Sequence, residues 1–162
     1  MGRKVLMGDR IILSVDPGKA SGICTFSITP GGEPVLEKSG EYQMREYHLP
    51  IYETLKYAKA TDSKVEIVCE RFIINAQTVR NSQAPYSLEQ IGILKYIMLD
   101  NGIDPDELIF QSPSDAKKMF SNDALKKLEY WHRGGEGHAL DAIRHGLLRL
   151  VKTGWKPMKL LR

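Results

Sequence analysis

A short apolar run that stops at an acidic turn constrains the fold of this chain more than any other feature. Residues 11–15 (Ile-Ile-Leu-Ser-Val) are rich in β-branched side chains and are followed at once by Asp16, Pro17 and Gly18. Pro17 has no N–H for a sheet ladder and Gly18 accepts unusual backbone angles, so a strand should end here in a tight turn. The first expected element is therefore a buried strand with a carboxylate at its carboxyl end.

Two more strands are expected directly after this turn. Residues 22–28 and 35–42 have strand-like patterns, and the segment 29–32 (Thr-Pro-Gly-Gly) between them is a strong turn. Because tight turns join antiparallel neighbours, the first three strands should form an antiparallel meander.

Helical and strand patterns alternate after the meander. The expected helices cover about 46–60, 88–100 and 137–152, and the expected strands cover 65–69 and 108–110. Ser87 is expected to cap the second helix, a short helix should open at 112–115, and 75–82 has the composition of an irregular polar loop. This element order predicts a mixed α/β sheet with helices on its faces.

Length and composition fit one compact domain spanning residues 1–162. Cys24 and Cys69 lie in strand-like runs without paired spacing, which indicates reduced core residues instead of a disulfide or a zinc site. No apolar run approaches the ~20 residues that span a membrane and no signal peptide opens the sequence, so we expect a cytoplasmic protein without a membrane partner.

The charge of the chain is mildly basic. The formal net charge is +3, and the tail from about residue 152 carries cations and no acid. Such a tail is compatible with following a phosphate backbone and equally with a frayed terminus. Charge alone therefore does not decide for or against nucleic-acid binding.

Three carboxylates stand where three different elements end or begin. Asp16 follows the first strand, Glu70 follows the strand at 65–69, and Asp141 lies near the start of the last helix, three positions after His138. The carboxyl ends of neighbouring parallel strands share one crevice, and helix positions three apart share one face. Gathered carboxylates repel one another without a cation, so we expect Mg²⁺ or Mn²⁺, with two ions ~4 Å apart able to activate water for phosphodiester cleavage.

Each of these residues also has an ordinary structural interpretation. An Asp before Pro-Gly is common in turns, and a Glu at a strand end often pairs with a nearby surface cation. His138 could bond to the helix backbone, and Asp141 could interact favourably with the helix dipole. Only the combination, in this order along the chain, points to a metal site.

The combination resembles the RuvC-type Holliday-junction resolvases of the RNase H-like superfamily, and most closely their small phage-encoded members. Three motifs carry the resemblance in the family's order: residues 16–22 (Asp-Pro-Gly-Lys-Ala-Ser-Gly), 68–70 (Val-Cys-Glu) and 138–142 (His-Ala-Leu-Asp-Ala). The likeness spans about residues 11–151.

The resemblance implies a fold, an activity and a set of site residues. The fold is RNase H-like: a five-stranded mixed sheet with its first three strands antiparallel, flanked by helices. The activity is that of a homodimer, acting in the cytoplasm (of the host, if phage-encoded), which cleaves Holliday junctions and related branched DNA with two Mg²⁺ or Mn²⁺ ions per site. Asp16, Glu70 and Asp141 match the family's catalytic carboxylates, and His138 matches a position where members carry Asp or His as a fourth metal-site residue.

The DNA-binding residues are matched less closely. Lys117 or Lys118 resembles a family lysine near the DNA backbone. The family places an aromatic residue soon after the catalytic Glu; Phe72 is one residue short of that offset and fits a core role equally well. The segment 120–137 is also shorter than in bacterial resolvases, which leaves junction selectivity open.

The last helix offers further candidate contacts to phosphate. Arg144, His145, Arg149 and Lys152 are expected on or beside its polar side, where a solvated surface is the plain alternative for the last two. The apolar helix at 88–98 could pair with its symmetry mate in the dimer or pack only on its own sheet.

Two rival classes remain. An actin-like or sugar-kinase-like ATP-binding domain also has glycines after an acidic first strand, but such proteins need two domains and this chain is too short for both. A non-catalytic RNase H-like module for nucleic-acid binding or assembly is the second rival, and the intact acids argue against it.

Overall fold

A five-stranded mixed sheet forms the centre of the computed structural model, which describes residues 9–80 and 84–161. The strands are β1 (Arg10–Asp16), β2 (Ala20–Ile28), β3 (Val35–Gln43), β4 (Lys64–Glu70) and β5 (Ile109–Gln111), in the spatial order β3-β2-β1-β4-β5. β1 and β2 pair antiparallel, as do β2 and β3, whereas β4 is parallel to both β1 and β5. The predicted antiparallel meander within a mixed sheet is confirmed.

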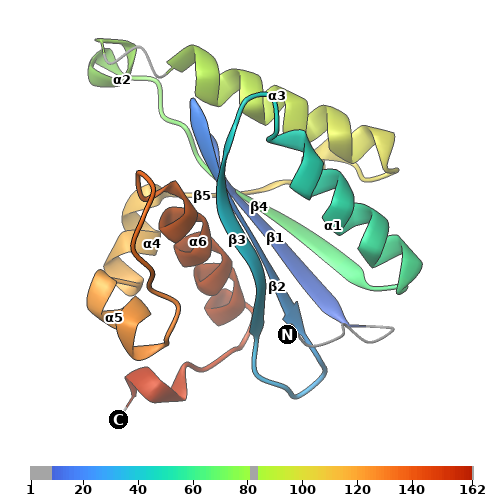
Figure 1. Ribbon diagram of the computed structural model, residues 1–162, viewed down its shortest axis with the longest axis vertical. Helices are drawn as coiled ribbons and strands as arrows, with labels where there is room; N and C mark the ends of the chain where they lie inside the picture. The colour runs from blue at the N-terminus through green and yellow to red at the C-terminus, as the bar shows by residue number, and fades with distance from the viewer. Residues whose placement is uncertain (1–8, 81–83, 162) are drawn as a thin grey trace.

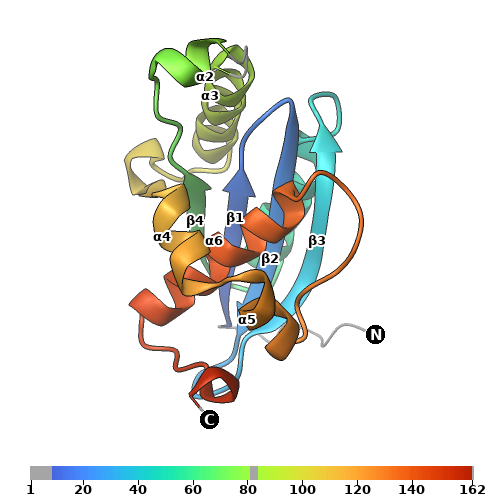
Figure 2. The same cartoon turned by 90° about the vertical axis from the view of Figure 1, so that its left-hand side faces the viewer.

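Helices cover both faces of this sheet (Figures 1 and 2). One face carries α1 (His48–Ala60) and α3 (Ala84–Asp100), and the other carries α4 (Pro113–Met119), α5 (Asn122–Lys127) and α6 (His138–Lys152). The short α2 (Ala76–Arg80) projects beyond the sheet, and two 3-10 turns, η1 (Pro105–Glu107) and η2 (Met158–Leu160), complete the fold. In the described parts of the chain, none of the helices has the length and apolar character needed to cross a membrane.

The alternation of side chains along β1 sorts the core into two layers. Leu13 and Val15 pack in the cluster under α1 and α3, while Ile12 packs in the cluster under α6. Because successive strand residues point to opposite faces, Ser14 and Asp16 share the α6 side with Ile12. Ser14 confirms this geometry, since its hydroxyl donates to the Ala142 carbonyl of α6 at 2.8 Å. The strand period thus decides which helix Asp16 faces.

Small residues let α6 lie close to the sheet. A Cβ at Gly146 would approach the Phe26 ring to 2.8 Å, and the carbonyl of Ala142 accepts hydrogen bonds from both Ser14 and Cys24. Cys24 is fully buried and free, as is Cys69, which confirms that both are core residues.

Two sequence-based expectations about the helices are wrong, and one helix was not predicted. The segment expected to be an irregular loop contains α2, although its last two residues, 81 and 82, lie outside the described part of the chain. α3 begins at Ala84 and not after Ser87, whose buried hydroxyl donates to the Pro17 carbonyl at 3.0 Å instead of capping the helix. α5 was not predicted; its N-terminus is capped by Ser121, which accepts from the Ala124 N–H.

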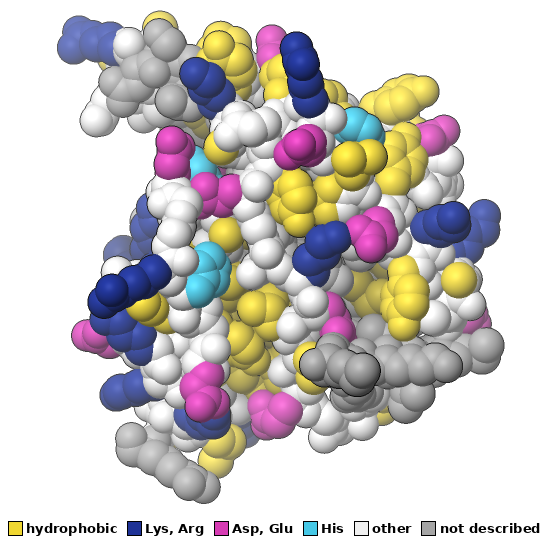
Figure 3. Space-filling model, viewed as in Figure 1, with side chains coloured by type: hydrophobic (Ala, Val, Ile, Leu, Met, Phe, Trp, Pro, Cys, Tyr) yellow, Lys and Arg dark blue, Asp and Glu magenta, His cyan; other side chains and the backbone are white. Residues whose placement is uncertain are grey.

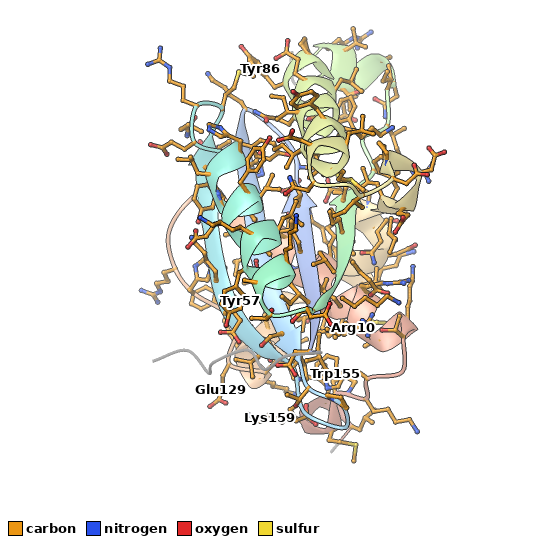
Figure 4. The ribbon with its side chains drawn as sticks, turned by 90° about the vertical axis from the view of Figure 1, so that its right-hand side faces the viewer. Arg10, Tyr57, Tyr86, Glu129, Trp155 and Lys159 are labelled. Atoms are coloured by element: carbon orange, nitrogen blue, oxygen red, sulfur yellow. The ribbon has the colours of Figure 1, made fainter. Side chains whose placement is uncertain are left out.

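The basic tail packs back onto the domain instead of fraying. Trp155 Nε1 donates to Glu33 at 2.8 Å, and Lys159 pairs with Glu129 at 2.6 Å. Figure 4 shows Trp155 and Lys159 at the end of the molecule opposite Tyr86. Trp155 and Leu160 also pack against the cluster under α6, so the tail is a structural element at the end of the sheet away from the acidic turn.

Candidate metal centre

Sheet register brings Asp16 and Glu70 together. The parallel pairing of β1 with β4 runs through Val15 and Cys69, so Asp16 and Glu70 are the next residues in register. Each lies two positions after a residue on the α6 side, Ser14 and Val68 respectively, and therefore points to the same face. The carboxyl ends of two neighbouring parallel strands thus bring two carboxylates together at one edge of the sheet, as the sequence predicted.

The first turn of α6 supplies the third carboxylate. One oxygen each of Asp16, Glu70 and Asp141 can be chosen so that all three lie within 4.8 Å of one another. Asp16 is buried, whereas Glu70 and Asp141 are partly exposed. The predicted convergence of these acids from three separate elements is therefore present in the structure.

The burial of Asp16 changes its acidity. Burial raises the pKa of Asp16 to about 6, the hydrogen bond from His138 opposes this, and the nearby Glu70 and Asp141 add to it. A buried carboxylate surrounded by other carboxylates is costly to ionise unless a cation compensates for it. Oxygen ligands of this kind are those that Mg²⁺ and Mn²⁺ prefer, so the donor set fits a hard divalent ion.

His138 lies against Asp16 at the start of α6. Its Nδ1 is 2.9 Å from Asp16 Oδ2, and its Nε2 is 3.6 Å from Glu136 Oε2. The hydrogen bond to Asp16 raises the pKa of His138 to about 9, which makes the pair a His⁺–carboxylate contact at neutral pH. His138 must therefore release a proton before Nδ1 can act as a metal ligand.

Asp141 is held by two cations. Arg144 Nη1 donates to Asp141 Oδ1 at 2.6 Å, and Lys117 Nζ lies 3.3 Å from Asp141 Oδ2. Arg144 also donates to the Phe120 carbonyl and to Asn122, and is only 8% exposed. The expectation that Arg144 faces solvent on the polar side of the last helix is wrong, because its guanidinium is occupied between α6 and the start of α5.

Glu70 is held by a histidine from the same helix. His145 Nε2 lies 2.8 Å from Glu70 Oε2, and His145 Nδ1 lies 2.9 Å from Gln111 Oε1. His145 is 1% exposed, so it too is absent from the solvated face on which it was expected. The sequence signal was its position, four residues after Asp141, where one helical turn brings it back to the same face.

Glu41 is a site residue that the sequence interpretation missed. Its carboxylate accepts from the backbone N–H groups of Glu136 and His138, both at 2.9 Å, and so satisfies donors at the open N-terminus of α6. Burial raises the pKa of Glu41, and the backbone hydrogen bonds outweigh it, leaving the pKa below its ordinary value. Glu41 pairs with Gly22 in the β2–β3 register, a position that local sequence patterns do not reveal.

Of the exposed candidate DNA-binding residues, Lys117 lies beside this centre, with its Nζ 3.3 Å from Asp141 Oδ2. Lys117 and Lys118 are exposed on α4, and Lys126 and Lys127 are exposed on the adjacent α5. Figure 3 shows Lys and Arg side chains gathered over α4 and α5. Phe72 is half-buried in the segment that leaves β4 after Glu70.

Solved structures of other proteins share the fold of this chain. No sequence-family model and no curated protein matches the chain. Among solved structures, it is similar to the RuvC structure from Thermus thermophilus, with a TM-score of 0.65 at 13% identity over 89% of this chain and 96% of that one. T. thermophilus RuvC in complex with a Holliday junction substrate gives a TM-score of 0.56 at 11% identity, with the same coverage.

The chain has a RuvC-like fold. This likeness confirms the RNase H-like architecture that the sequence predicts. At these identities it shows the fold alone, and activity depends on the side chains of the site.

Proposed function

We propose that this protein is a divalent-metal-dependent endonuclease that cleaves Holliday junctions and related branched DNA. The observation that carries the proposal is the convergence of Asp16, Glu70 and Asp141 at the carboxyl ends of two parallel strands of a RuvC-like fold. The kinship with small phage-encoded resolvases, suggested by the motifs, stays a prediction.

The three acids would hold Mg²⁺ or Mn²⁺, with His138 as the fourth member of the set. When two ions are bound, they supply an activated water and neutralise charge on the cleaved phosphate. Asp16 is the most buried of the three acids, so it would be the most tightly held of the metal-binding side chains. His138, in contact with Asp16, would also serve as a proton carrier.

DNA would approach over α4 and α5. The four exposed lysines of these helices would provide the basic surface, and one of them, Lys117, already reaches the Asp141 carboxylate. Phosphate contacts from lysines supply affinity and register without reading sequence. Phe72 would lie near the branch point in this arrangement, whereas buried Arg144 would act on DNA only through Asp141 and the α4–α5 connection.

A homodimer through α3 would match the two-fold symmetry of a four-way junction. α3 exposes an apolar stripe at Leu88 (46%), Tyr96 (66%) and Leu99 (61%), which its own sheet leaves uncovered. Figure 3 shows hydrophobic side chains exposed on the side that carries α1 and α3. Exposed apolar patches of this kind favour association with a second copy, so Tyr96→Glu should shift the protein from dimer to monomer in light scattering.

The proposed activity is tested by incubating the full chain with a synthetic four-way junction, with and without Mn²⁺. We expect metal-dependent nicks near the branch point and little cutting of a linear duplex with the same arm sequences. Binding of the junction without any cleavage across Mg²⁺ and Mn²⁺ concentrations would instead support the second candidate, a non-catalytic RNase H-like module. Equal cutting of both substrates would contradict selectivity for branched DNA.

A further inference from the structure

The side chain of His145 is polar and lies where the core should be apolar. It is 1% exposed, and Leu148, one turn further along the same side of α6, is buried as well. A buried imidazole is costly unless its ring nitrogens are hydrogen-bonded. A leucine would fill this position without that cost, so the polarity of His145 calls for a reason beyond packing.

Both ring nitrogens of His145 have partners that come from the sheet. Nε2 faces Glu70 on β4 at 2.8 Å, and Nδ1 faces Gln111 on β5 at 2.9 Å. Glu70 and Gln111 are themselves paired in the β4–β5 register, and the Arg71 N–H donates to the Gln111 carbonyl at 2.7 Å. The imidazole is therefore clamped between two adjacent strand ends.

The direction of the hydrogen bond to Glu70 follows from the chemistry of the groups. An ionised carboxylate only accepts, so Nε2 carries the hydrogen and donates it to Oε2. Turning the Gln111 amide changes what faces Nδ1 but leaves this bond unchanged. Oε2 of Glu70 thus has a buried donor from α6, and this hydrogen bond restrains the rotamer of the Glu70 side chain.

We propose that His145, oriented by Gln111, is a positioning residue that fixes Glu70 for metal binding. The inference rests on the proposed function, since it assumes that Glu70 is a metal ligand. Groups that orient metal ligands from behind contribute strongly to metal affinity because they remove the rotamer freedom that binding would otherwise have to restrict. In this arrangement α6 supports two acids from behind, Asp141 through Arg144 and Glu70 through His145.

The test is the affinity for Mn²⁺ in the absence of DNA, measured by electron paramagnetic resonance or calorimetry on the full chain. We expect His145→Leu to raise the Kd for Mn²⁺ by about 10- to 100-fold. His145→Gln, whose amide nitrogen can replace Nε2 as the donor to Glu70, should stay within about threefold of the wild type by the same reasoning. Glu66→Gln is the matched control, because it removes ion pairs farther back along the same strand without touching the centre.

A purely structural role for His145 predicts a different pattern. It would lower the melting temperature of both His145 variants while leaving the Kd of the folded protein unchanged, which would overturn the inference. If His145→Leu does not fold, Gln111→Leu replaces it, with an expected loss of affinity of about threefold or more from the freed imidazole. An unchanged Kd in that variant would count equally against the proposal.

The Mn²⁺ titration distinguishes a failure of the proposed function from a failure of the role proposed for His145. A wild type that binds no Mn²⁺ contradicts the proposed function and the inference together. A wild type that binds Mn²⁺ and cuts junctions, beside a His145→Leu variant with an unchanged Kd, contradicts the inference alone.

Discussion

A Cβ atom at Gly22 would lie 1.9 Å from the backbone carbonyl oxygen of His138. This close approach between β2 and the N-terminus of α6 places the first turn of the helix, and with it Asp141, over the end of β1. The absence of a side chain at Gly22 is therefore a requirement for assembling the centre.

Gly22→Ala should accordingly destabilise the protein. Because the new methyl group meets backbone, α6 must shift, and we expect a loss of about 1–3 kcal/mol in the free energy of unfolding. Gly92→Ala is the matched control: this glycine lies inside α3 with nothing near its Cβ position, so alanine should stabilise by about 0.5–1 kcal/mol. Urea denaturation of both variants provides the measurement, and equal effects would contradict the packing argument.

The contact between His138 and Asp16 predicts an unusual titration. Since the hydrogen bond to Asp16 raises the pKa of His138 to about 9, the imidazole should still be protonated at pH 8 in metal-free buffer. NMR titration of the wild type and of Asp16→Asn should show the pKa of His138 falling toward about 6.5 in the variant. Identical titration curves would show that the contact with Asp16 is not the cause.

Glu66 should make the stability of the protein depend on pH in a way that does not involve the metal centre. Burial raises its pKa, but hydrogen bonds from Arg149 and Arg10 outweigh this, so the pKa of Glu66 lies below its ordinary value. The ionised form therefore contributes stability that is present above the unfolded-state pKa and is lost as pH falls through the folded-state pKa. Glu66→Gln should cost about 1–3 kcal/mol at pH 7.

The difference in unfolding free energy between wild type and Glu66→Gln should then narrow as the pH falls from the ordinary pKa of glutamate, about 4.3, towards the lower folded-state pKa. Denaturation curves at several pH values measure this. A difference that stays constant down to pH 3 would contradict the assigned direction of the shift.

The basic surface on α4 and α5 predicts a salt dependence. Replacing Lys117 and Lys118 together with alanine should weaken junction binding and reduce the slope of log K against log[salt] by about one for every phosphate that these lysines neutralise in the wild type. Lys56→Ala is the control, because Lys56 is exposed on α1, on the other face of the sheet. Equally weakened binding in both variants would contradict binding of the junction on the surface of α4 and α5.

Much of the fold could be predicted from local patterns because each strand is short and bounded by strong turns. The Asp-Pro-Gly turn after Val15 and the Thr-Pro-Gly-Gly turn after Ile28 punctuate the meander, and the 3.6-residue period identifies α6. α2 and α5 have too few residues for a period to be visible, and α5 depends on a single capping residue, Ser121. The start of α3 was misplaced because the tertiary contact of Ser87 with Pro17 overrides its capping preference.

The candidate centre, too, could be predicted only in part. The expected topology grouped the carboxylates at the strand ends. It did not identify the residues that form hydrogen bonds to these carboxylates. Arg144 and His145 have the composition of a polar helix face and become buried only because Asp141 and Glu70 lie beneath them. Glu41 looks like an ordinary residue of an edge strand until the N-terminus of α6 is placed beside it.

The central claim is that the three acids perform metal-dependent chemistry, and Asp16→Asn tests it most directly. The variant keeps the size of the side chain but removes the charge of the buried member of the cluster. Cleavage of a labelled four-way junction in Mn²⁺ should fall by at least about 10³-fold, in line with the several kcal/mol that metal ions contribute to charge stabilisation, while junction binding in EDTA stays near that of the wild type. Wild-type rates of Mn²⁺-dependent cleavage by Asp16→Asn would contradict the account.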